Sequence, residues 1–216
     1  MSFDRIKEII ENSFFSNTAL AHSTTGDGRL DSAESEAVII SHLIELFSNT
    51  DVEVEVAPPR CWYDVAFKVG EDVLYTNIKI TSGCQADNVS SKLGLFYTLT
   101  GILPTDIKDV RLDRWDSYNK KLLENLNYNC NADYYFVVYF KESESFLITS
   151  LKRIQTLVPN GSNLPFQCKW SDNCTFSTRT TEEQSQYLMD VYYNSWLKKI
   201  GGFEPLIRWR SKNEFK

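Results

Sequence analysis

The sequence predicts an α/β fold, in which a central mixed β-sheet carries helices on both faces in a three-layer arrangement. Segments with the helical repeat of apolar residues alternate with strand-like segments, in the order helix, strands, helix, strands, helix. The run "DYYFVVYF" at 133–140 combines aromatic and β-branched residues, which is typical of a buried strand. A chain of 216 residues with 42% hydrophobic content is large and apolar enough for one domain with a substantial core.

The first helix is predicted over 32–48, "SAESEAVIISHLIELFS", where Asp31 or Ser32 can act as the N-cap. Glutamates in its first turn favour the helix dipole. Its expected apolar stripe consists of Ile40, Leu43, Ile44 and Phe47. A strand over 52–57 follows and stops at two prolines, because proline cannot donate a hydrogen bond to a neighbouring strand.

Residues 63–80, "YDVAFKVGEDVLYTNIKI", alternate with a period of two and predict a β-hairpin. The Gly-Glu pair between the strands suits a two-residue loop with Gly at its first central position. With that loop, Asp64 falls opposite Asn77, and Lys79 lies on the same face two residues further on. Cross-strand partners lie about 5 Å apart, so an acid, a carbonyl ligand and an ammonium group share one patch. The alternative is a surface-facing hairpin with scattered polar residues.

The remainder of the chain continues the alternation of helices and strands. A glycine ends the next helix, and Thr180 with Glu183 matches a capping box before the last one. The strand at 145–150 is predicted to pair antiparallel with the buried strand before it. The predicted elements are helices over 88–100, 114–126 and 181–200, and strands over 133–140, 145–150 and 165–170.

Composition excludes several classes of protein. There is no run of 18 or more apolar residues, so no membrane partner is expected. The start "MSFDRIKEIIENSFF" lacks a signal-peptide core, which predicts a cytoplasmic protein. The five cysteines form no Cys-x-x-Cys pair and the two histidines are far from Cys168 and Cys174, so neither a zinc site nor a disulfide framework is expected.

Asp-x12-Asn-x-Lys in this hairpin setting resembles the signature of the PD-(D/E)XK nucleases, and within them the type II restriction endonucleases of the blunt-cutting EcoRV/HincII-like branch. Four stretches carry the resemblance: "SAESEAVIISHL", "WYDVAF", "NIKI" and "QADNVSSKLGLFY", with a weaker echo in "FSTRTTEEQSQYL". Together they span about residues 29–200. The resemblance implies a restriction-endonuclease-like α/β/α fold and a single nuclease domain over 1–216. In that domain the catalytic core covers about 29–150, and C-terminal strands and a helix cover 151–216.

The resemblance also implies a metal site. Asp64 takes the place of the first catalytic acid, Lys79 that of the catalytic lysine, and Glu34 that of the acid on the first helix. Asn77 stands where the pattern has Asp or Glu, so it supplies a carbonyl ligand without charge, and Glu34 must contribute more or metal affinity is weaker. The expected cofactor is Mg²⁺, with Mn²⁺ as a substitute, held by Asp64, Asn77 and Glu34, and no organic cofactor is expected.

The segment after the lysine looks like the loop and helix that meet DNA in such enzymes. Gln85 and Asn88 are the expected base contacts, in the major or the minor groove. Ser90, Ser91 and Lys92 lie in the first turn of the predicted helix, where backbone N–H groups and a hydroxyl suit a phosphate. Asp87 or Asn88 as a simple helix cap is the alternative, and capping is compatible with DNA contact.

The predicted activity is Mg²⁺-dependent hydrolysis of phosphodiester bonds in double-stranded DNA. A homodimer acting on a short palindromic site is expected, because two-fold protein symmetry mirrors two-fold DNA symmetry. The net charge of −6 argues only weakly against this partner, since binding depends on where charge lies. The alternatives are a monomeric repair or nicking nuclease of the same fold and a binding module without activity. A basic stretch at 108–121 contains Lys108, Arg111, Arg114, Lys120 and Lys121. It either contacts the DNA or is a solvent-exposed helix face.

Overall fold

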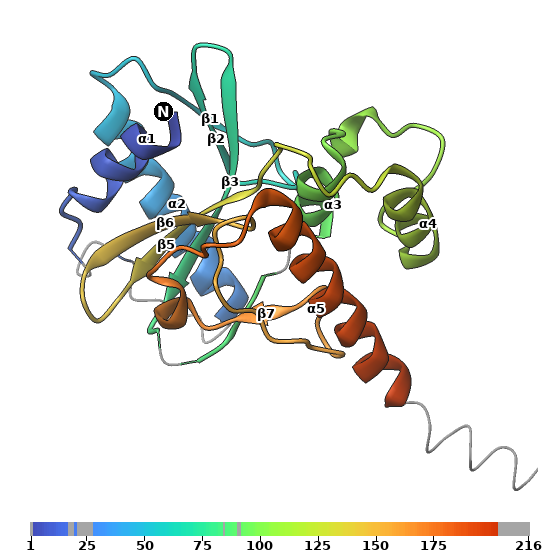
Figure 1. Ribbon diagram of the computed structural model, residues 1–216. Helices are drawn as coiled ribbons and strands as arrows, with labels where there is room; N and C mark the ends of the chain where they lie inside the picture. The colour runs from blue at the N-terminus through green and yellow to red at the C-terminus, as the bar shows by residue number, and fades with distance from the viewer. Residues whose placement is uncertain (1, 17–19, 21–27, 84, 90–91, 203–216) are drawn as a thin grey trace, which may run out of the picture.

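The computed structural model describes residues 2–16, 20, 28–83, 85–89 and 92–202, except for the side chains of residues 28–33. Its α-helices are α1 (Ser2–Glu11), α2 (Gly28–Phe47), α3 (Lys92–Thr100), α4 (Trp115–Asn125) and α5 (Thr181–Gly201). Its strands are β1 (Glu53–Val56), β2 (Val65–Val69), β3 (Asp72–Thr81), β4 (Asp87–Asn88), β5 (Tyr135–Phe140), β6 (Ser145–Ser150) and β7 (Gln167–Cys168). Two short 3-10 helices, η2 (Pro104–Asp106) and η3 (Trp170–Asn173), complete the order (Figure 1).

Five of the strands form a mixed sheet in the order β1-β2-β3-β5-β6. All neighbours are antiparallel except β3 and β5, which run parallel and are joined through α3 and α4. The predicted mixed sheet and the antiparallel pairing of 145–150 with the strand before it are therefore confirmed. Strand β5 lies between two neighbours, and its residues 136–139 are all buried, as its apolar run predicts.

The sheet carries a hydrophobic cluster on each face, because side chains alternate along a strand. On β5, Phe136 and Val138 belong to the cluster that includes residues of α3, α4 and α5. Val137 and Tyr139 belong to the other cluster, which includes residues of α1 and α2. Figure 1 shows α1 and α2 beside the sheet, with α3 and α4 at the other end of the molecule and α5 running away from it. The protein is thus an α/β fold with a central mixed sheet.

Several elements with local sequence signals lie where they were expected. Helix α4 covers the predicted 114–126 to within one residue at each end. Helix α5 begins with the predicted capping box: the Thr180 hydroxyl accepts from the Glu183 N–H at 3.2 Å, and the Thr180 N–H donates to the Glu183 carboxylate at 2.8 Å. Gly101 follows α3 with a φ of +75°, a left-handed conformation that glycine adopts without steric cost.

Two predictions about α2 are wrong. The helix begins at Gly28, so Asp31 and Ser32 lie inside it and neither is the N-cap. The first turns of a helix tolerate both residue types, and an acid there is favoured by the helix dipole. Ile44 is 43% exposed, whereas Ile39 is buried. The buried stripe of α2 therefore contains Ile39 in place of Ile44.

Two further differences lie elsewhere in the chain. The helix expected over 88–100 begins only at Lys92, because Asp87 and Asn88 pair with β7 as strand β4. Helix α1 was not predicted, although Phe3, Ile6 and Ile10 have helical spacing and are buried. Among the described residues, no helix is long and apolar enough to cross a membrane.

Candidate active site

The β2–β3 hairpin has the predicted register. Val69 pairs with Asp72 and Val65 with Thr76, so the next position outward sets Asp64 against Asn77. The loop glycine, Gly70, has a φ of +60°, which the two-residue turn requires at its first central position. The backbone N–H of Asp64 donates to the Thr76 carbonyl at 2.9 Å, which extends the pairing of the strands.

The Asp64 carboxylate is bound from one side by strand β3. Its Oδ2 accepts a hydrogen bond from Asn77 Nδ2 at 2.5 Å and another from the Ile78 backbone N–H at 2.8 Å. Burial raises the pKa of Asp64 above its ordinary value, while the Ile78 N–H, the Lys79 charge and the Asn77 amide oppose that rise. The patch of acid, amide and ammonium is therefore assembled as the hairpin register predicts.

Lys79 also acts on a second carboxylate, Asp87, which was considered from sequence only as a helix cap. Burial raises the pKa of Asp87, while the Thr81 hydroxyl and the Lys79 ammonium lower it. Asp87 Oδ2 is buried and has no hydrogen-bond partner among the described residues. The indole of Trp170 lies close enough to lower this pKa, although its buried Nε1 forms no hydrogen bond with the described residues. Lys79 thus lies under the influence of two carboxylates.

A pocket of about 230 Å³ opens beside Asp64. Helix α2 contributes Glu36 to its wall, and the turn after β1 contributes Arg60. Glu34, the predicted third ligand, is exposed and is not part of this wall. A difference of two positions on a helix is a rotation of about 200°, so Glu34 and Glu36 lie on nearly opposite faces. The acid of α2 that shares the pocket with Asp64 is Glu36.

The segment predicted to contact DNA forms one side of a small ribbon in which β4 pairs antiparallel with β7. Gln85 and Asn88 are exposed. The Asn88 Oδ1 accepts a hydrogen bond from Gln167 Nε2 at 2.8 Å. Gln167 lies 79 residues away in the chain, so sequence reasoning did not associate the two amides. Ser90 and Ser91 lie outside the described residues.

Lys92 has contacts that differ from its predicted role at a phosphate. Its Nζ lies 4.3 Å from the centroid of the Trp115 ring and donates to the Asp113 carbonyl at 2.6 Å. Burial lowers the pKa of Lys92. The ammonium is therefore already held by a cation–π contact and a hydrogen bond, which leaves it less available to DNA.

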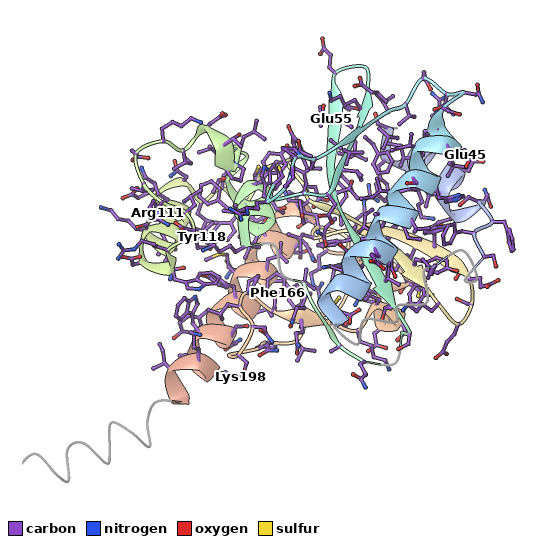
Figure 2. All side chains as sticks on the ribbon, turned by 180° about the vertical axis from the view of Figure 1, so that it is seen from behind. Glu45, Glu55, Arg111, Tyr118, Phe166 and Lys198 are labelled. Carbon is purple, nitrogen blue, oxygen red and sulfur yellow. The ribbon has the colours of Figure 1, made fainter. Side chains whose placement is uncertain are left out.

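The basic stretch before and within α4 is largely neutralised by neighbouring carboxylates. Arg111 pairs with Asp113, and Lys121 with Asp109. Arg114 lies 3.3 Å from Asp116. Figure 2 shows Arg111 at the end of the molecule away from Glu45 of α2. These contacts favour the solvated helix face, the alternative that the sequence left open.

No group of three or more His, Cys, Asp or Glu side chains is arranged for a metal ion in the described ranges. The described cysteines, Cys61, Cys130, Cys168 and Cys174, are free. No family model, curated protein or solved structure matches this chain.

Proposed function

We propose that this protein is a Mg²⁺-dependent endonuclease for double-stranded DNA, of the PD-(D/E)XK type with a restriction-endonuclease-like three-layer fold. The observation that carries the proposal is the hairpin register, which sets Asp64 against Asn77 and puts Lys79 on the same face. A mixed sheet with helices on both faces supports it at the level of architecture.

The donor atoms around Asp64 suit a hard divalent cation. Within the described part of the chain, Asp64 Oδ1 and Asn77 Oδ1 accept no hydrogen bond, whereas Asp64 Oδ2 accepts two. Glu36 adds a carboxylate to the same pocket. Oxygen ligands of this kind are those that Mg²⁺ and Mn²⁺ prefer. Asp64, Asn77 and Glu36 are therefore the proposed ligands, with Glu36 in place of Glu34.

The residues of the site have separate roles in this proposal. A divalent ion held there polarises the phosphate and lowers the pKa of water. Asp64 lines the pocket, and strand β3 holds its Oδ2 through two hydrogen bonds, which leaves Oδ1 to bind the ion. Lys79 contributes a positive charge beside the phosphorane-like transition state, where charge develops during phosphodiester cleavage. No nucleophilic side chain is required.

Target recognition is assigned to the exposed amides of the β4–β7 ribbon. Amide side chains form paired hydrogen bonds with adenine in the major groove. A homodimer on a short palindromic site is the proposed assembly, because a two-fold protein presents two identical ribbons to two half-sites.

A second function, a DNA-binding module without activity, is favoured by one observation. The Asn77 amide donates a hydrogen bond to the Asp64 carboxylate, so the two side chains are stable beside each other without a metal ion. In an active site built on two acids, like charges need a cation between them.

Incubation of supercoiled plasmids of different sequence with Mg²⁺, Mn²⁺ or EDTA tests the proposal. A site-specific dimeric nuclease gives discrete linear fragments with either metal ion and none in EDTA, and Asp64→Asn abolishes them. Nicked circles alone indicate the monomeric repair or nicking nuclease. Intact plasmid that is nevertheless bound indicates the inactive module. If the protein neither cleaves nor binds any of the plasmids, a DNA function is refuted.

A further inference from the structure

The turn after β1 contains an unusual residue. The Cys61 N–H donates to the Pro58 carbonyl at 3.1 Å, which closes a four-residue turn with Pro59 and Arg60 at its centre. Arg60 has a φ of +67°. Proline at the second position and a positive φ at the third are the pattern of a type II turn, and the third position normally requires glycine. An arginine there carries a steric penalty that glycine avoids.

Arg60 is exposed, and its guanidinium has no polar partner among the described residues. It forms no hydrogen bond or ion pair with the part of the chain that the structure describes, and it is not among the charges that shift the pKa of Asp64. The other arginines whose side chains are described are engaged. Arg5, Arg111 and Arg114 have ion pairs, while Arg153 and Arg179 lie over aromatic rings. The strain at Arg60 is therefore not offset by a contact within the described chain.

The strained Arg60 lies at the candidate active site. Arg60 lines the pocket that contains Asp64 and Glu36. A strained residue at the edge of a candidate active site is kept where the surrounding structure and the function require it. A guanidinium presents two parallel N–H donors that match the oxygens of a phosphate. A divalent ion held by the two carboxylates of the pocket contacts only the phosphate at the reaction centre, so a guanidinium at the rim is free to bind a neighbouring phosphate.

We propose that Arg60 binds a phosphate of the DNA strand that enters the Asp64 pocket, and that the strained turn is kept because it holds the guanidinium at this place. The inference rests on the proposed nuclease function. It adds to that function a phosphate contact outside the Asp64, Asn77 and Lys79 hairpin.

Arg60→Gly separates the two consequences of this arrangement. Glycine relieves the turn, so the urea midpoint of unfolding rises. The variant loses the phosphate contact, so affinity for a short mixed-sequence duplex, measured by fluorescence anisotropy with Ca²⁺ in place of Mg²⁺, falls about tenfold. The slope of log affinity against log salt decreases in magnitude by about one. Arg60→Lys keeps the charge and the salt slope. It recovers only part of the affinity, because an ammonium lacks the two parallel N–H donors of a guanidinium.

Glu144→Gly is the matched control. Glu144 is the other described non-glycine residue with a positive φ, +50°, and it lies in the β5–β6 loop. Its replacement removes a positive-φ side chain that lies outside the Asp64 pocket, and it leaves DNA affinity and the salt slope as they are. A binding difference confined to Arg60 therefore reports the side chain and not the relief of strain.

Two results overturn the inference while the nuclease proposal stands. One is wild-type affinity and an unchanged salt slope in Arg60→Gly. The other is a lower urea midpoint in that variant, which makes Arg60 a structural residue. Failure of the wild-type protein to bind any duplex overturns the nuclease proposal, and the phosphate assigned to Arg60 with it.

Discussion

Asn77 donates a hydrogen bond from Nδ2 to Asp64 Oδ2 across 2.5 Å, and the Ile78 N–H donates to the same oxygen. One oxygen of the carboxylate is thereby saturated from strand β3, and the other is left for a cation or a water molecule. A second acid at position 77 would face Asp64 with like charge in place of a donor. Asn77 is therefore a neutral partner that holds Asp64 in place.

Asn77→Asp tests this relationship through metal binding. Two carboxylates in contact repel one another, so the variant is expected to be less stable than the wild type at neutral pH without metal ions. Mg²⁺ relieves the repulsion, so it raises the melting temperature of the variant more than that of the wild type. The measurement is thermal unfolding across a Mg²⁺ titration. The Mg²⁺ concentration for half-maximal cleavage falls in the variant, although turnover slows if the site is adapted to a neutral ligand.

Asn77→Ala completes this comparison because it removes the donor without adding charge. It is expected to need more Mg²⁺ than the wild type for the same cleavage rate. Three superimposable Mg²⁺ curves for the wild type, Asn77→Asp and Asn77→Ala would show that Asn77 is not a ligand.

Lys79→Ala is expected to lower the cleavage rate by a factor on the order of 100 or more while cognate DNA is still bound. In the proposed mechanism the Lys79 ammonium stabilises charge that develops in the transition state, so ground-state affinity suffers less. Single-turnover cleavage and equilibrium binding measured on the same duplex separate the two effects. Lys68→Ala, on β2 and paired with Glu55, is the control for loss of a lysine from the hairpin. Wild-type cleavage in Lys79→Ala would make the hairpin a structural element only.

The hairpin could be predicted from sequence because its register depends on local features. A glycine in a two-residue loop and strict alternation fix which residue faces which, so the contact of Asp64 with Asn77 follows from the fourteen consecutive residues 64–77. The capping box of α5 is local for the same reason. Neither prediction needs knowledge of the rest of the chain.

Other features of the site depend on contacts between distant segments. The phase of α2 is set by its packing on the sheet, and the sequence alone does not fix it. Glu34 was chosen from the resemblance, as the acid that follows Ala33 on the first helix, whereas Glu36 lines the pocket. The β4–β7 pairing brings Gln167 to Asn88, which lies 79 residues away in the chain. A strand of two residues is too short for its sequence pattern to predict this pairing. Asp87 was treated only as a possible cap for the same reason.

The paired amides of Asn88 and Gln167 predict coupled effects on target recognition. Gln167 Nε2 orients Asn88 through its Oδ1, so loss of either side chain disturbs the same base contact. Asn88→Ala and Gln167→Ala should each cost about 1–3 kcal/mol in specific binding and leave non-specific binding nearly unchanged. In the double variant the costs should not add. Gln186→Ala, an exposed hydrogen-bonded glutamine on α5, is the control. Additive losses, or unchanged discrimination between cognate and mismatched duplexes, would contradict the coupling.

The partly buried Asp133 predicts a pH-dependent component of stability. Burial raises its pKa to about 6, although the N–H groups of Tyr134 and Lys152 bind its Oδ1. The pKa in the unfolded chain is about 3.9, so between these values the folded state binds the proton more tightly. Stability from this group is therefore full below about pH 4 and is lost as pH rises through about 6.

Asp133→Asn keeps the accepting oxygen and removes this titration. The difference in unfolding free energy, wild type minus variant, should fall by on the order of 2 kcal/mol between about pH 4 and pH 7. Urea unfolding at a series of pH values measures it. Asp109→Asn is a control of opposite sign, because Lys121 lowers the pKa of the exposed Asp109. Parallel stability profiles for the wild type and Asp133→Asn would rule out this component.

Asp87 joins the β4–β7 ribbon to Lys79, the proposed catalytic lysine, and its removal tests that link. Its backbone belongs to β4, the Lys79 charge lowers its pKa, and its Oδ2 is buried without a partner in the described chain. Asp87→Asn preserves shape but removes a negative charge near the Lys79 ammonium. Cleavage should therefore slow by about tenfold or more while DNA affinity is equal or higher, since a negative charge near the phosphates is lost. Asp87→Glu should restore part of the rate. Asp172→Asn, in the neighbouring η3, controls for loss of an acid nearby and should cleave normally. Equal losses of affinity and of thermal stability in Asp87→Asn, with an unchanged rate on saturating DNA, would instead assign Asp87 to the folding of the ribbon.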